Sequence, residues 1–292
     1  MPETGPVGVG FLGTGMISNT YLENLTKFPD VRVVILGDLN TELAAAQAAK
    51  YGVPQSGSAD DVLAHPDVEL IVNLTIPAVH AEVSSQTLAA GKHVWSEKPI
   101  SLDLATGRAL LDQADAAGLL VGVAPDTVLG PGVQTARRAI ARGDIGEPLS
   151  AQTIMQYIGP DIFHPSPEFL FAKGAGPLFD MGPYYLTALI HIFGSVESVA
   201  AVGSKSRATR IVQTGDRVGT EFTVEVGEDG ETAITTAEGE VAITDPARRR
   251  PMSPCRAGMR WGIGPRRTRK AGFWGAPKAH DLRQTVAQWG PM

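Results

Sequence analysis

The chain has 292 residues, a formal net charge of −6 and one cysteine, Cys255. A length of this order predicts two domains, and a composition of 43% hydrophobic and 19% charged residues predicts a soluble globular protein. The single cysteine excludes an intramolecular disulfide framework and favours a reducing cytoplasm. The N-terminal residues lack the basic region of a signal peptide, and no apolar run reaches the ~18 residues of a membrane span.

The first predicted element is a short buried strand, Val7–Leu12, which ends in a glycine turn. Apolar residues then recur at helical spacing as far as Phe28. In this strand-turn-helix context, Gly13-x-Gly15-x-x-Ser18 predicts a dinucleotide-binding turn. Its first glycine permits the tight turn, and its second lets the backbone approach a pyrophosphate. The residues expected to bind the cofactor here are Gly13, Thr14, Gly15, Met16 and Ile17.

The second predicted strand, Val31–Leu36, leads to Asp38, which follows Ser18 by 20 residues. At this spacing the dinucleotide fold places the acid that binds the ribose 2′-hydroxyl. No Lys or Arg occurs at 39–41 to hold a 2′-phosphate, so we predict NAD as the cofactor, with NADP as the other option. The alternative role for Asp38 is to cap the next helix, which Asn40 could do instead.

Helices and strands alternate through the rest of the first half. The predicted helices cover 41–50, 77–90 and 102–117, and the predicted strands cover 70–75, 93–96 and 119–123. This order predicts a doubly wound parallel sheet, a Rossmann domain over residues 1–124. Ligands bind at the carboxyl ends of such strands. Residues that directly follow strands should therefore face the crevice beside the glycine turn, namely Thr75, Pro77, Lys98 and Asp126.

Five motifs together resemble the glucose-fructose oxidoreductase / inositol dehydrogenase / MocA family. They are Gly13-x-Gly15, Thr75-x-Pro77-x-x-His80, Glu97-Lys98-Pro99, Asp144-Ile145-Gly146-Glu147-Pro148 and the glycine-rich stretch 174–184. The resemblance runs from residue 7 to about Val226 and fails beyond it. It implies a Rossmann domain, then an α+β domain with an open, mostly antiparallel sheet. It also implies homo-oligomers and NAD(P)-dependent redox chemistry on sugars, polyols and related compounds.

The resemblance assigns the family's working lysine to Lys98. An ammonium group at a strand end can hold a substrate hydroxyl and lower the pKa of a neighbouring acid. The alternative is a surface lysine before a proline turn. Pro99 is expected to fix that turn, with a cis bond as one way of doing so. Two neighbours complete the expected cofactor region: Glu97, a contact or a structural residue, and His80, which touches the cofactor or caps a helix.

The family's second element is Asp-x-x-x-His, which Asp180 matches and in which Tyr184 takes the histidine position. Residues four apart share one helix face, so both are expected to address one substrate. Tyrosine transfers protons when a cation such as Lys98 lowers its pKa from about 10. Alternatively, Tyr184 packs in the core. His164, in a proline-rich loop, is a second candidate base or a solvent-exposed histidine.

The second domain is expected over residues 125–245, with strands at 152–157, 196–202 and 221–226 and a hairpin at 237–241. Residues 246–292 hold eleven Lys and Arg residues against one acid, without hydrophobic periodicity. We predict that this basic tail forms no ordered part of the domain, and that it reflects truncation or a reading-frame change. A nucleic-acid-binding tail is the alternative, but no binding motif accompanies the charge.

These observations predict an oxidoreductase that moves a hydride between NAD(P) and a sugar, polyol or related hydroxy or keto compound. The alternatives are a non-enzymatic dinucleotide-binding sensor and an inactive, truncated family member. Lys98 and Asp180 favour the enzyme. A metal site is not expected, because there is one cysteine and no helix carries two histidines spaced i, i+4.

Overall fold

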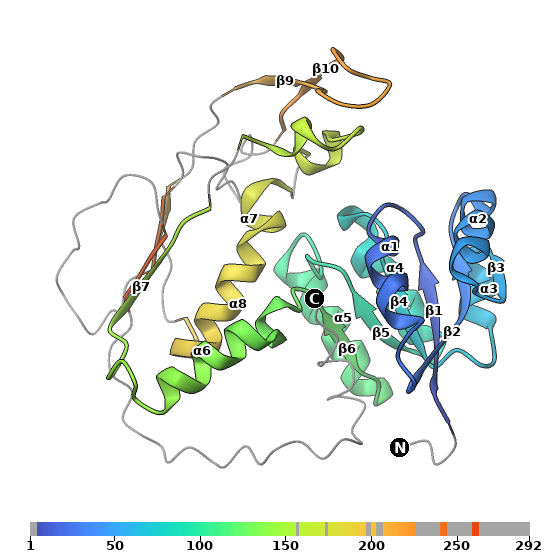
Figure 1. Cartoon of the computed structure of the whole chain (residues 1–292), viewed down its shortest axis with the longest axis horizontal. Helices are drawn as coiled ribbons and strands as arrows, with labels where there is room; N and C mark the ends of the chain where they lie inside the picture. The colour runs from blue at the N-terminus through green and yellow to red at the C-terminus, as the bar shows by residue number, and fades with distance from the viewer. Residues whose placement is uncertain are drawn as a thin grey trace. The chain divides into compact units, whose positions relative to one another are not determined.

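The computed structural model describes residues 5–155, 158–172, 175–196, 200–202, 207–225, 240–243 and 259–262. The chain forms two compact units that divide between Gly130 and Pro131, a few residues after the predicted boundary at 124. Figure 1 shows the helices and strands of both units. Among the helices in these ranges, none has the length and apolar character needed to cross a bilayer.

The first unit is a six-stranded parallel sheet in the order β3-β2-β1-β4-β5-β6 (Figure 1). Its strands are β1 (Val7–Leu12), β2 (Val31–Gly37), β3 (Gln55–Gly57), β4 (Leu70–Asn73), β5 (His93–Ser96) and β6 (Val121–Val123). Its helices are α1 (Ser18–Leu25), α2 (Thr41–Tyr51), α3 (Ala59–Ala64), α4 (His80–Ala89) and α5 (Leu104–Ala117). The prediction of a doubly wound sheet is confirmed, and the order reverses between β1 and β4, where such folds bind ligands.

The core occupies both faces of this sheet. β1 is buried at all of its positions. One apolar cluster joins Phe11 to Leu22 of α1, and a second joins Leu12 to Val62 of α3. Fully burying side chains of this size contributes about 1.5–3 kcal/mol each, so the continuous apolar run of β1 anchors the fold on both sides.

Side-chain caps set where the helices begin. The Asn40 side chain accepts a hydrogen bond from the amide of Leu43 at 3.1 Å, and Asp103 caps α5 in the same way. Ser58 and Asp61 form a reciprocal capping box at the start of α3, an element that the sequence analysis missed. Each cap satisfies amide groups that have no partner inside the helix, which stabilises a helix by about 1 kcal/mol.

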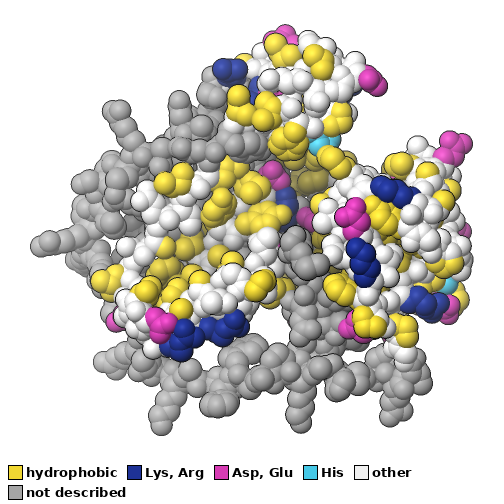
Figure 2. Space-filling model, in the orientation of Figure 1, with side chains coloured by type: hydrophobic (Ala, Val, Ile, Leu, Met, Phe, Trp, Pro, Cys, Tyr) yellow, Lys and Arg dark blue, Asp and Glu magenta, His cyan; other side chains and the backbone are white. Residues whose placement is uncertain are grey.

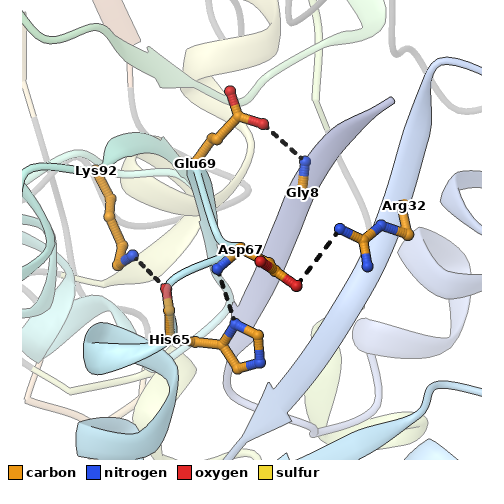
Figure 3. Close-up of polar contacts among 6 residues, drawn as sticks. All are labelled: Gly8, Arg32, His65, Asp67, Glu69 and Lys92. Atoms are coloured by element: carbon orange, nitrogen blue, oxygen red, sulfur yellow. Dashed lines mark hydrogen bonds and ion pairs between the residues drawn. The ribbon is translucent and has the colours of Figure 1, made fainter. Parts of the chain in front are cut away.

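Polar contacts hold together the amino ends of the strands of this sheet (Figure 3). Glu69 Oε1 accepts the amide of Gly8 at 3.3 Å, and Lys92 Nζ donates to the carbonyl of His65 at 2.8 Å. Burial lowers the pKa of Lys92. A Cβ at Gly8 would lie 1.7 Å from the carbonyl oxygen of Asp67, so the backbone approach requires glycine. These contacts fix the segment between α3 and β4. This segment lies at the amino ends of the strands, whereas ligands of such sheets bind at the carboxyl ends.

The second unit contains two small sheets. One has the order β7-β12-β11-β8 and the other pairs β10 with β9, and all pairings are antiparallel except β11 with β12. The strands are β7 (Ser150–Thr153), β8 (Ala200–Val202), β9 (Thr209–Ile211), β10 (Glu221–Thr223), β11 (Glu240–Ile243) and β12 (Met259–Gly262). The helices are α6 (Pro131–Ala141), α7 (Gly176–Asp180) and α8 (Gly182–Phe193). The expected mostly antiparallel sheet is therefore confirmed.

One strand of this sheet comes from the predicted basic tail. β12 pairs with β7 and with β11, so the expectation of no ordered structure after residue 245 is wrong for Met259–Gly262. In the sequence, Met259 and Trp261 alternate with Arg260, and this two-residue period is typical of a strand rather than of a helix. The other residues of 246–292, like parts of the strands predicted at 152–157, 196–202 and 221–226, lie outside the described residues.

A buried ion pair fastens the loop that carries His164. Asp161, which is 2% exposed, accepts from Arg210 Nη1 at 2.7 Å and from the Gln213 side chain at 2.9 Å. A Cβ at Gly159 would lie 2.3 Å from the same guanidinium atom, and this glycine has a φ of +128°. The loop is thus fixed on β9 by charge pairing and by a backbone that only glycine adopts readily.

Candidate functional site

The glycine turn lies where β1 ends, beside the end of β4. Gly13 has a φ of +98°, and a Cβ there would lie 2.6 Å from the carbonyl oxygen of Leu74. The turn therefore requires glycine at this position both for conformation and for space. At Gly15 no described atom comes within 4 Å of the position of a Cβ. Packing within the described part of the chain does not explain this second glycine, and the space above it is open for a ligand.

Amide groups face this open space. Among the described residues, the amides of Gly15, Met16 and Ile17 donate to no other group of the chain. Ser18 Oγ donates to the carbonyl of Gly15 at 2.7 Å and so fixes the start of α1. Free amides and the positive end of a helix dipole at one place form a site for a phosphate group.

Asp38 is held against the glycine turn. Its Oδ2 accepts the amide and the hydroxyl of Thr14 at 2.7 and 2.8 Å, and its Oδ1 accepts the amide of Asn40 at 3.0 Å. The cap of α2 is Asn40, which leaves Asp38 free of the alternative role of helix cap. Its carboxylate thus lies at the end of β2, next to the turn, where the dinucleotide fold places the acid that binds ribose.

Large apolar side chains are exposed around the same edge of the sheet. Leu39, directly after Asp38, is 101% exposed, and Met16, Ile17 and Ile76 are exposed as well. Each of them follows the carboxyl end of a strand or lies in the glycine turn. An apolar rim around a few polar groups is typical of a small-molecule site.

Asn73 and His80 organise the loop after β4. The buried Asn73 amide donates to the carbonyl of His80 at 3.0 Å, while its oxygen accepts the Thr75 hydroxyl at 2.6 Å. The His80 ring is 1% exposed, with Nε2 2.8 Å from the Thr75 carbonyl and Nδ1 2.8 Å from the Pro99 carbonyl. Among the described residues His80 does not cap α4. This geometry favours an indirect role, in which the His80 ring supports the backbone at Thr75 and Pro99.

Lys98 follows β5 on the same edge of the sheet. The Lys98–Pro99 peptide bond is cis, as the sequence suggested. The amide of Lys98 donates to Oε2 of Glu97 at 3.1 Å, and Oε1 of Glu97 accepts the hydroxyl of Tyr21 at 2.8 Å. Glu97 is therefore hydrogen-bonded to α1, the helix that begins at the glycine turn, and to the backbone of Lys98.

Asp126 is a further acid at this edge, after the end of β6. Burial raises the pKa of its carboxyl to about 6, and the negative charge of Glu97 adds to the increase. A carboxyl with such a pKa is typical of functional sites, although buried charge networks produce it too. The sequence placed Asp126 after a strand, but no motif marked it as a titrating group.

The residues expected to contact substrate from the second unit lie on separate elements there. Asp180 is the last residue of α7 and Tyr184 lies in the first turn of α8, because the helix breaks at Met181. The expectation of one continuous helix face for the two residues is therefore wrong. Gly182 and Pro183, the first two residues of α8, explain the break, since proline favours a helix start.

His164 accepts the amide of Ser166 on Nδ1 at 3.1 Å.

The first unit alone fits a dinucleotide. A free Gly15 surface, donor amides and a fixed acid at the end of β2 match the three requirements of that fold. On the face drawn in Figure 2, charges of both signs are interspersed over the described part of the first unit around α2. The described residues on this face form no basic patch of the kind that binds nucleic acid.

Comparison with known families agrees with this geometry. Residues 7–124 match the model of the GFO/IDH/MocA oxidoreductase family, described as an NAD-binding Rossmann fold, and residues 133–252 match a C-terminal domain of the same family. The chain belongs to the GFO/IDH/MocA family of oxidoreductases. The second match passes Val226, so the expectation that the likeness fails there is wrong.

The individual relatives have low sequence identity to this chain. Trans-1,2-dihydrobenzene-1,2-diol dehydrogenase of Bos taurus is 28% identical over 67% of this chain and 59% of its own length. The 1,5-anhydro-D-fructose reductase of Ensifer adhaerens is 28% identical over 49% of this chain and 43% of its own length. A levoglucosan dehydrogenase structure with NADH and L-sorbose has a TM-score of 0.71 at 22% identity, over 88% of this chain and 66% of that one. At that identity the likeness shows the fold alone.

Proposed function

We propose that this chain is an NAD-dependent dehydrogenase or reductase for a sugar, polyol or diol. The observation that carries the proposal is the Asp38 carboxylate, held at 2.7 Å by the amide of Thr14 beside the open surface of Gly15. When bound, NAD supplies the nicotinamide that exchanges a hydride with a substrate carbon. No basic residue follows Asp38 at 39–41, which favours NAD over NADP.

Lys98 is proposed to bind the substrate hydroxyl. With one ribose at Asp38 and the pyrophosphate at the glycine turn, the rest of a dinucleotide extends over the ends of β4, β5 and β6. Lys98 follows β5, the middle strand of these three. An ammonium group there holds the hydroxyl oxygen and stabilises negative charge that develops on it.

The proton of that hydroxyl needs an acceptor. We propose Tyr184 for this step, with Asp180, four residues before it, as a substrate-binding residue and His164 as the other candidate base. A phenol can take up a proton when a bound cation lowers its pKa. The chain spans 59% of the length of its bovine relative. A cytoplasmic location and assembly into homo-oligomers are proposed on the cysteine content and on the family resemblance.

A substrate panel tests this function. Purified protein is mixed with NAD or NADP and with trans-diols, polyols and sugars, and the absorbance of the reduced cofactor is followed. We expect turnover with NAD on at least one hydroxylated compound. Tight NAD binding without turnover on any compound would contradict the enzyme and favour a dinucleotide sensor.

A further inference from the structure

Tyr21 connects the glycine-turn helix to the strand that leads to Lys98. Its hydroxyl donates to Oε1 of Glu97 at 2.8 Å and accepts the indole N–H of Trp95 at 3.2 Å. Trp95 is 4% exposed, and Tyr21 and Glu97 are half-buried, so this chain of hydrogen bonds runs from the core toward the surface. The three residues come from α1, β5 and the residue directly after β5.

The direction of these hydrogen bonds follows from the chemistry of the groups. An indole N–H only donates, and an ionised carboxylate only accepts. The single proton of the Tyr21 hydroxyl therefore points to Glu97. Burial, followed by the negative charge of Glu97, raises the pKa of Tyr21 well above its ordinary value. Tyr21 thus remains a neutral donor and is no proton acceptor for a substrate.

The residues directly before and after Lys98 are both held by hydrogen bonds. Before it, Glu97 accepts the Tyr21 hydroxyl on one oxygen and the Lys98 amide on the other, while its own amide donates to the Asn73 carbonyl at 2.9 Å. After it, the carbonyl of Pro99 lies 2.8 Å from the His80 ring. The backbone at Lys98 is consequently tied to α1 on one side and to α4 on the other.

We propose that Tyr21 is a positioning residue for Lys98, which it orients through the Glu97 carboxylate. The proposal rests on the proposed function of Lys98. It gives a reason for the tyrosine in α1, the helix whose first turn is proposed to bind the cofactor. One helix would then position both the pyrophosphate and Lys98. Charged groups near the Tyr21 hydroxyl in the described part of the chain are Glu97 and Asp126.

Tyr21→Phe removes the hydroxyl alone and leaves the ring in place. Tyr51→Phe is the matched control. The Tyr51 hydroxyl also bonds to α1, at Asn19 Oδ1 at 2.8 Å, but among the described residues it makes no hydrogen bond to Glu97. A hydrogen bond to a charged group changes an equilibrium by about 10- to 100-fold. We therefore expect kcat to fall by about 10-fold or more in Tyr21→Phe, with little change in the Kd for NAD, and neither value to change in Tyr51→Phe.

A second readout does not require activity. In the protein without cofactor, the Lys98 amide should exchange its hydrogen at least about 10-fold faster in Tyr21→Phe than in wild type, and at the wild-type rate in Tyr51→Phe. Glu97→Gln, which retains an acceptor for Tyr21 but loses one carboxylate oxygen, should also release the Lys98 amide. This variant serves if Tyr21→Phe does not fold.

The outcomes separate the two proposals. Loss of turnover on every substrate in wild type contradicts the proposed function, and the exchange rate of the Lys98 amide still decides the role of Tyr21. Unchanged exchange in Tyr21→Phe, or equal losses in Tyr21→Phe and Tyr51→Phe, would show that the tyrosine only anchors α1. Either result would overturn the positioning role.

Discussion

Gly13 and Gly15 lie two residues apart in one turn, but they should serve different purposes. Gly13→Ala should lower the stability of the fold, and Gly15→Ala should weaken cofactor binding. In Gly13→Ala, a residue with a Cβ must adopt a φ of +98° and place that atom 2.6 Å from the Leu74 carbonyl oxygen. The left-handed backbone alone costs roughly 1–2 kcal/mol. Relieving the close contact with Leu74 would cost further free energy, because the end of β4 would have to shift. We expect Gly13→Ala to lose about 2–4 kcal/mol of the free energy of unfolding, within the range of a strained backbone position.

Gly15→Ala should have the opposite profile. No described atom lies within 4 Å of the new Cβ, so the free energy of unfolding should stay within about 0.5 kcal/mol of wild type. The methyl group instead occupies the surface that a pyrophosphate approaches. Losing one charge-assisted hydrogen bond of about 1.5–3 kcal/mol should raise the Kd for NAD by about 10- to 100-fold.

Denaturant unfolding and isothermal titration with NAD measure both effects. Gly118→Ala is the control for backbone cost alone, because Gly118 has a φ of +66° and no described atom within 4 Å of its Cβ position. It should lose less stability than Gly13→Ala. Wild-type affinity for NAD in Gly15→Ala would refute a pyrophosphate at this turn, and wild-type stability in Gly13→Ala would refute the packing against β4.

Three further predictions concern charged side chains. Asp38→Ala should weaken NAD binding more than NADP binding, measured by titration with both cofactors; equal losses would argue against a ribose contact. Burial raises the pKa of Asp126 to about 6 from 3.8, so the folded protein holds this proton more tightly than the unfolded chain does. The free energy of unfolding should then fall as pH rises from 3.8 to about 6, and Asp126→Asn should remove that fall in denaturation series across this window; an unchanged pH dependence would contradict the shift. Arg210→Ala leaves the buried Asp161 carboxylate without its cation, with Gln213 as its remaining side-chain donor. This should cost about 3–5 kcal/mol in urea unfolding, whereas a loss below about 1 kcal/mol would mean that water reaches the carboxylate.

The sequence predicted best what depends on local composition. The strands β1 and β4 are short, mostly apolar runs, and β1 and β5 were predicted to the residue. Asp38 was found by spacing alone, and the structure places it on the glycine turn through Thr14. Elements without such a signal were missed. β3 has the sequence Gln-Ser-Gly, and it exists because it pairs with β2 rather than because of its own side chains.

Long-range hydrogen bonds could not be predicted. The helical spacing of Tyr21 marked it as an apolar face residue, but its hydroxyl partner is Glu97, 76 residues away. The break between α7 and α8 was predictable in principle, since Gly182-Pro183 is a local signal that a helix starts. The family pattern of Asp180 and Tyr184 suggested a single helix instead.

The role of Lys98 is the most direct test of this account. Turnover of the best substrate from the panel is compared between wild type and Lys98→Ala, with NAD binding measured on the same samples. We expect Lys98→Ala to bind NAD normally and to lose turnover by orders of magnitude, because the proposed role of the lysine is to stabilise charge on the substrate oxygen. Turnover within a few-fold of wild type at unchanged NAD binding would contradict it.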